Sequence, residues 1–79
     1  MAVVAKITDK DAPKIQHIFK INDIESIWQH LEHIVGEEIG ENGISVYIEA
    51  SSWCEIATVG EEFDHEKFVI EIAEEGSAF

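Results

Sequence analysis

Residues 23–35 read DIESIWQHLEHIV, and they show the clearest periodicity in the chain. Apolar residues recur there every three or four positions, which places them on one stripe of a helix. Asn22, followed by Glu25 three residues later, has the form of an N-cap with a capping-box acid, and Gly36 or Gly40 can end the element. The stretch therefore predicts an amphipathic helix with its stripe on the core. The stripe consists of Ile24, Ile27, Trp28, Leu31, Ile34 and Val35.

The segment after this helix predicts a β-hairpin. Apolar and polar residues alternate through 44–50, the pattern of a half-buried strand. A tight turn at Ser51 and Ser52 would return the chain along a second strand, whose apolar residues fall on the same side. We therefore expect two paired strands over 44–59.

The flanking segments add further strands. Residues 67–73 alternate again, after an acidic loop at 60–66, and the last residues of the chain are expected to fray. The periodicity of 15–21 fits either a helix or a strand, and we favour a strand that pairs with 3–7. The element order is then β-β-α-β-β-β: an α+β fold with one helix on a four- or five-stranded antiparallel sheet.

Length and composition predict one domain over residues 1–79 in the cytoplasm. A chain of 79 residues is short for two cores. Its one cysteine, Cys54, cannot form an internal disulfide, as expected in a reducing compartment. No apolar run approaches the length of a membrane span, and the first residues do not resemble a signal peptide. We expect no cofactor.

The charge is the most informative property of the composition. Seventeen acids oppose five lysines and no arginine, for a formal net charge of −12. Four of the lysines lie in the first twenty residues, so the acidity is concentrated in the rest of the chain. Such a field repels nucleic acid and membrane surfaces and attracts basic ones. We therefore expect a protein partner with a basic surface and no direct binding to nucleic acid.

Part of this acidity lies where local rules disfavour it. Glu37, Glu38 and Glu41 follow the predicted helix, where carboxylates oppose the helix dipole and no lysine lies four residues away. A local rule broken without compensation points to function, although solubilising surface charge is an equal alternative. Exposed aromatic residues would anchor such a contact. The predicted partner-binding residues are Glu37, Glu38, Glu41, Glu61, Glu62, Asp64, Glu66, Trp53 and Tyr47.

Two other chemistries have weaker support. His30, His33 and Glu37 fall at spacings that bring them to one side of a helix, as a metal site requires, but nothing in the sequence completes a ligand set. Cys54 could act as a nucleophile with His65 or His17 as its base, yet a lone cysteine is more often a small buried hydrophobe. Neither pattern leads us to expect an enzyme.

These observations favour a small non-enzymatic binding protein. By analogy in size and charge, it would be an inhibitor that mimics nucleic acid and blocks a nuclease or defence complex, like anti-CRISPR or anti-restriction proteins of phages and mobile elements. One alternative is a homodimeric structural, accessory or antitoxin-like module that associates through a sheet edge or through a face with Tyr47 and Ile56. A second alternative is a metal-binding protein that uses His30 and His33.

Overall fold

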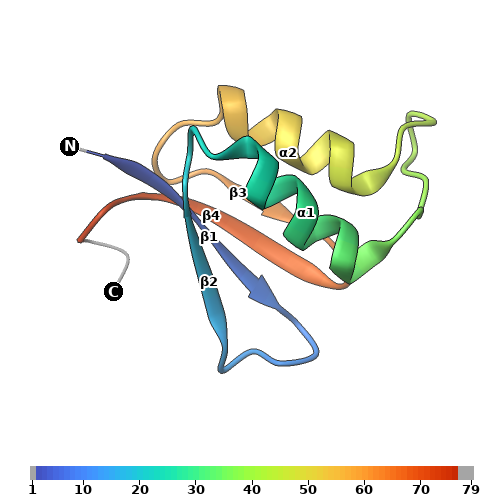
Figure 1. The fold of residues 1–79 in the computed structure, drawn as a ribbon, viewed down its shortest axis with the longest axis horizontal. Helices are drawn as coiled ribbons and strands as arrows, with labels where there is room; N and C mark the ends of the chain where they lie inside the picture. Colours follow the sequence, from blue (N-terminus) through green and yellow to red (C-terminus); the bar gives the residue numbers. More distant parts are fainter. Residues whose placement is uncertain (1, 77–79) are drawn as a thin grey trace.

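Strands and helices alternate in pairs along the chain. The computed structural model describes residues 2–76, and in that range the elements follow the order β-β-α-α-β-β (Figure 1). Residues 77–79, where most of the expected fraying would fall, lie outside the described part. Within the described part, neither helix has the length and apolar character needed to cross a bilayer. The elements are β1 (Val3–Asp9), β2 (Gln16–Lys20), α1 (Ile24–Val35), α2 (Val46–Ile56), β3 (Glu62–Asp64) and β4 (Phe68–Glu74).

The strands form one antiparallel sheet in the order β2-β1-β4-β3. The central pair of this sheet is β1 and β4, which lie near the two ends of the chain, and Ile7 is opposite Ile70. Both helices lie on one face of the sheet, so the molecule has two layers (Figure 1). The other face carries an ion pair between Lys6 and Glu71, whose Nζ and Oε1 atoms are 2.9 Å apart.

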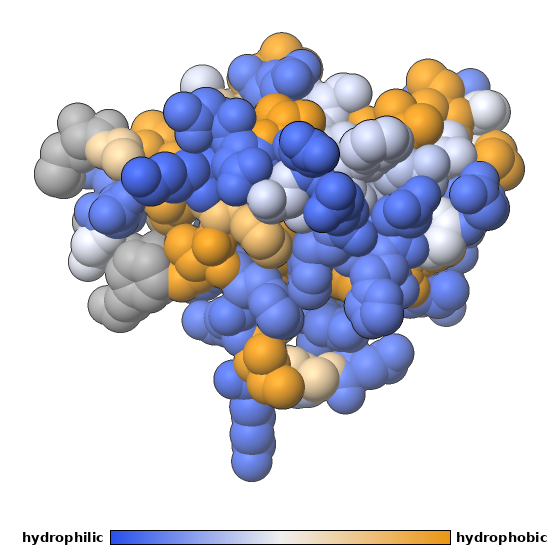
Figure 2. Space-filling model, viewed as in Figure 1, coloured by the Kyte–Doolittle hydropathy of each residue, from blue (hydrophilic) through white to orange (hydrophobic). Residues whose placement is uncertain are grey.

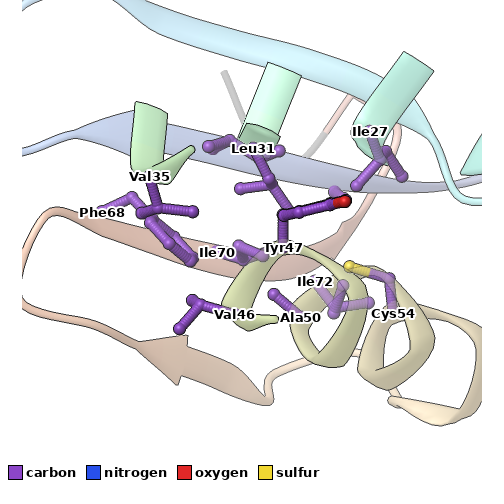
Figure 3. Close-up of a cluster of buried hydrophobic side chains, with 12 residues drawn as sticks. Ile27, Leu31, Val35, Val46, Tyr47, Ala50, Cys54, Phe68, Ile70 and Ile72 are labelled. Carbon is purple, nitrogen blue, oxygen red and sulfur yellow. The ribbon is translucent and has the colours of Figure 1, made fainter. Parts of the chain in front are cut away.

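The core lies between the helices and the two central strands (Figure 3). Phe68, Ile70 and Ile72 alternate along β4 toward the helices, and each is at most 1% exposed. Burial of apolar surface, at about 25 cal/mol per Å², is the main contribution that holds the two layers together. The helices supply Ile27, Leu31, Val35, Val46, Tyr47, Ala50 and Cys54 to the same cluster.

The α+β class is confirmed, but the hairpin predicted over 44–59 is wrong. Most of that segment is α2, so the sheet is covered by two helices instead of one. The side chains that α2 buries, at positions 46, 47, 50, 51 and 54, follow a helical period and not alternation. Ser51, expected in a turn, donates its hydroxyl hydrogen bond back to the carbonyl oxygens of Tyr47 and Ile48, at 2.8 and 3.1 Å.

The first predicted helix is confirmed, with a shifted cap. α1 is capped by Asp23 and not Asn22: the Asp23 carboxylate accepts from the Ser26 backbone N–H at 3.4 Å. Gly36, with φ of 58°, ends the helix. The strand interpretation of 15–21 is confirmed by β2, and the loop expected at 60–66 contains the short strand β3.

Candidate functional site

An acidic groove of about 430 Å³ opens at the end of the molecule where α1 ends and α2 begins. The connection between the helices forms one wall, and β3 with the β3–β4 turn forms the other (Figure 1). Two of the acidic segments recognised in the sequence therefore face each other across a gap. The carboxylates that line the groove belong to Glu38, Glu41, Glu49, Asp64 and Glu66.

Backbone hydrogen bonds fix the wall formed by the connection. The Val46 N–H donates to the Glu38 carbonyl at 2.8 Å, and the Gly40 N–H donates to the Ile44 carbonyl at 2.8 Å. Gly40 also makes room for an acid: a Cβ atom added there would lie 2.8 Å from Oε2 of Glu49. A glycine at this position therefore lets the Glu49 carboxylate lie against the backbone of the connection.

Glu38 ties the two walls together. Its Oε2 lies 2.7 Å from His65 Nε2, an ion pair when the imidazole is protonated, and its Oε1 lies 3.6 Å from Lys67 Nζ. Both partners come from the β3–β4 turn, far away in the sequence. The unfavourable position of this acid near the end of α1 is thus compensated by tertiary contacts. Glu38 has a structural role at the groove, which the sequence pattern alone does not indicate.

The remaining carboxylates of the groove differ in their partners. Asp64 is paired with Lys10, with Oδ1 and Nζ 2.7 Å apart, although both side chains are exposed and the pair is screened by water. Within residues 2–76, no cation lies within 4.0 Å of Glu41, Glu49 or Glu66. These three acids leave the groove with unneutralised negative charge.

Three of the predicted binding acids lie outside the groove. Glu61 accepts hydrogen bonds from the Thr58 side chain and backbone, at 2.6 and 2.9 Å, and these lower the pKa of its carboxyl. Glu62 lies on the edge strand β3, opposite Glu71 of β4. Glu37 does not line the groove. The structure therefore divides the predicted acids, and only those of the groove form one surface.

The two predicted aromatic anchors have different environments. Tyr47 is 7% exposed and packs against Trp28, with ring centroids 5.7 Å apart, so it is not available as an exposed anchor. Burial raises the pKa of its phenol, and the carboxylate of Glu37 raises it further. Trp53 is half-buried beside Phe63, with centroids 5.5 Å apart, and lines a second groove next to the acidic one.

The alternative chemistries find little support in the geometry. His30 turns toward the sheet and packs on His17, with ring centroids 4.1 Å apart, while His33 is exposed. No group of three or more potential ligands is placed to hold a metal in the described part of the chain. Cys54 faces the core with 0% exposure, and burial raises the pKa of its thiol to about 12 (Figure 3). A thiol in that state is a poor nucleophile.

Two titratable residues that line the groove, Glu49 and His65, are absent from the predicted binding residues. The alternation of residues 44–50 predicts a strand at Glu49, and no local pattern marks this residue as part of the first turn of α2. Comparison of the chain with models of protein families, with curated proteins and with solved structures found no match.

Proposed function

We propose that the chain is a non-enzymatic binding protein whose acidic groove receives basic side chains of a partner protein. The observation that carries the proposal is the convergence of acids from two distant segments around one gap, with Glu41, Glu49 and Glu66 left without a cation. Acids that served only solubility would be better separated, because like charges close together disfavour the folded state.

The partner that fits best is a protein whose basic surface normally holds nucleic acid. Carboxylates spaced along a groove can take the places of phosphates opposite lysine and arginine side chains. The net charge of −12 would steer such a partner toward the protein and repel nucleic acid. The mechanism would be competition, as in a small inhibitor of a nuclease or defence complex.

The buried state of Cys54 also favours a binding role over cysteine chemistry. Its side chain is a core residue of α2, and its thiol remains protonated at neutral pH. The histidine that lines the groove, His65, is held by Glu38.

A matched pair of charge variants tests the proposal. The groove variant carries Glu41→Gln, Glu49→Gln and Glu66→Gln, and the control carries Glu25→Gln, Glu74→Gln and Glu75→Gln. Both remove the same charge, and each includes one glutamate from the first turn of a helix. The control residues lie toward the opposite ends of α1 and β4, away from the groove.

The assay measures DNA cleavage by a panel of purified restriction endonucleases and CRISPR effector complexes with each form of the protein. We expect the protein to inhibit at least one of these enzymes. Added DNA should relieve this inhibition by competition, and higher salt should weaken it. The groove variant should lose about tenfold or more in potency while the control stays near wild type. Equal losses in the two variants, or no inhibition across the panel, would contradict the proposal.

A further inference from the structure

The outward side of α2 carries exposed isoleucines. Because the helix buries the side chains of positions 46, 47, 50, 51 and 54, the stripe with Ile48, Ser52 and Ile56 faces away from the core. Ile48 is 39% exposed, Ile56 is 80% exposed, and Ile44, just before the helix, is 44% exposed. Figure 2 shows hydrophobic surface at its upper right, over the connection between α1 and α2, beside hydrophilic residues. An i, i+4 row of this kind is the ridge that packs against a second helix.

This stripe borders an apolar groove of about 500 Å³ between α2 and β3. Trp53 and Phe63 form its aromatic side. Phe63 is stacked on the fully buried Phe68, with ring centroids 6.0 Å apart, which anchors that side to the core. The groove is therefore preformed, as sites for apolar anchors usually are.

The charges around the apolar groove indicate its occupant. Glu49 and Glu55 lie on its border, and Glu49 and Phe63 also line the acidic groove, so the two are continuous. An occupant needs apolar side chains for the apolar groove and cations for the acidic groove. A second copy of this chain is disfavoured, since it would bring another net charge of −12 against the same acids.

We propose that the apolar groove binds a basic amphipathic helix of the partner protein. Its apolar side chains would pack along Ile48 and Ile56 and against Trp53, and lysine or arginine at one end would reach the acidic groove. The inference rests on the proposed function for the basic character of the partner, and it adds the helical form and the place of its apolar anchors.

Trp53 provides a direct readout. Trp28, the other tryptophan, lies on α1 against Tyr47, so Trp28→Phe leaves Trp53 as the single reporter. The probes are two synthetic peptides of roughly 16 residues, about 24 Å as a helix, made of leucine and lysine in identical numbers. In one, leucine recurs at i, i+3, i+4 and i+7; in the other, the order is scrambled so that no apolar stripe forms.

We expect the amphipathic peptide to bind at least about tenfold more tightly than the scrambled one and to shift the Trp53 emission. The double change Ile48→Ser and Ile56→Ser should remove that preference. Ile15→Ser is the matched control, because Ile15 is 57% exposed and lies outside the groove on the β1–β2 connection. All three positions are exposed, so the variants should fold, which circular dichroism checks.

Other outcomes would overturn the inference in distinguishable ways. If the two peptides bind equally well, and the groove charge variant binds both more weakly, the proposed function would stand but the site for a helix would be ruled out. No binding of either peptide would contradict both. Sedimentation that shows a dimer lost on Ile48→Ser and Ile56→Ser would make a second copy the occupant and would also overturn the inference.

Discussion

At the scale of single residues, His17 of β2 and His30 of α1 pack against each other, with ring centroids 4.1 Å apart. Nε2 of His30 is buried and has no hydrogen-bond partner among the described residues. Burial lowers the pKa of His30, and the positive charges of His17 and His33 lower it further, while Asp9 raises it. The neutral imidazole is thus the form that fits between α1 and β2.

This environment predicts a loss of stability on mild acidification. With a folded-state pKa below 6.5, the unfolded chain binds the proton first, so the free energy of unfolding falls as the pH drops through 6.5. The loss stops once the folded-state pKa is passed. His30→Phe keeps an aromatic ring against His17 and removes the titration. The free energy of unfolding, measured by urea unfolding at several pH values between about 7.5 and 5.5, should therefore depend less steeply on pH in His30→Phe than in wild type.

The exposed His33 supplies the control. His33→Gln should keep most of the wild-type dependence of the free energy of unfolding on pH, because repulsion from His33 lowers the pKa of His30 less than burial or His17 does. Identical slopes in wild type and His30→Phe would show that His30 does not couple folding to pH.

At the scale of elements, α2 is where sequence patterns and structure diverge. Residues 44–50 alternate as a strand does, and the β-branched Ile44, Val46 and Ile48 agree with that reading. Val46 and Tyr47, however, begin a helical row of buried residues that continues through Ala50, Ser51 and Cys54. Over so few residues, periodicity cannot separate the two.

Proline at position 52 tests the helical structure of α2. Inside the helix it removes a backbone hydrogen bond and clashes with the preceding turn. Because Ser52 is exposed, its replacement removes no packing in the core, and the change in the free energy of unfolding reports on the backbone alone. We expect Ser52→Pro to lower the free energy of unfolding by about 3 kcal/mol or more, with reduced helical circular dichroism.

The control for this change is Ser52→Ala. Alanine favours the helix slightly, so stability should stay equal or rise by about 0.5 kcal/mol or less. A Ser52→Pro variant as stable as wild type would be incompatible with α2.

How far each element could be predicted follows from the length of its signal. α1 has an apolar stripe over three turns, and β4 alternates over seven residues, so both are recognisable without tertiary information. β3 has three residues and exists only through its pairing with β4. The choice of helix for α2 depends on the sheet face that it covers, which no local pattern describes.

At the scale of the whole molecule, the site also depends on tertiary contacts that local sequence patterns do not describe. The charge excess and the acidic segments are visible in the sequence, and so is the unusual position of Glu38. Its compensation by His65 and Lys67, however, exists only once the chain folds. The closing of two acidic segments around one groove is likewise a property of the topology.

A groove kept for binding should reduce stability. Repulsion among Glu41, Glu49 and Glu66 is present in the folded state and weaker in the expanded chain. We expect the groove charge variant to raise Tm by a few degrees at low salt, since roughly 1 kcal/mol corresponds to about 4–8 °C in a domain of this size. The effect should shrink at about 1 M salt, where the screening length is roughly 3 Å.

The control charge variant separates this effect from general relief of net charge. It removes as much charge from the other end of the molecule, so its Tm should rise less. A groove variant that gains stability and loses binding cannot have lost binding through misfolding, and both results would then have one cause, the crowded carboxylates. If thermal melts show the groove variant to be less stable than the control at low salt, its acids stabilise the fold, and loss of binding would no longer identify a recognition surface.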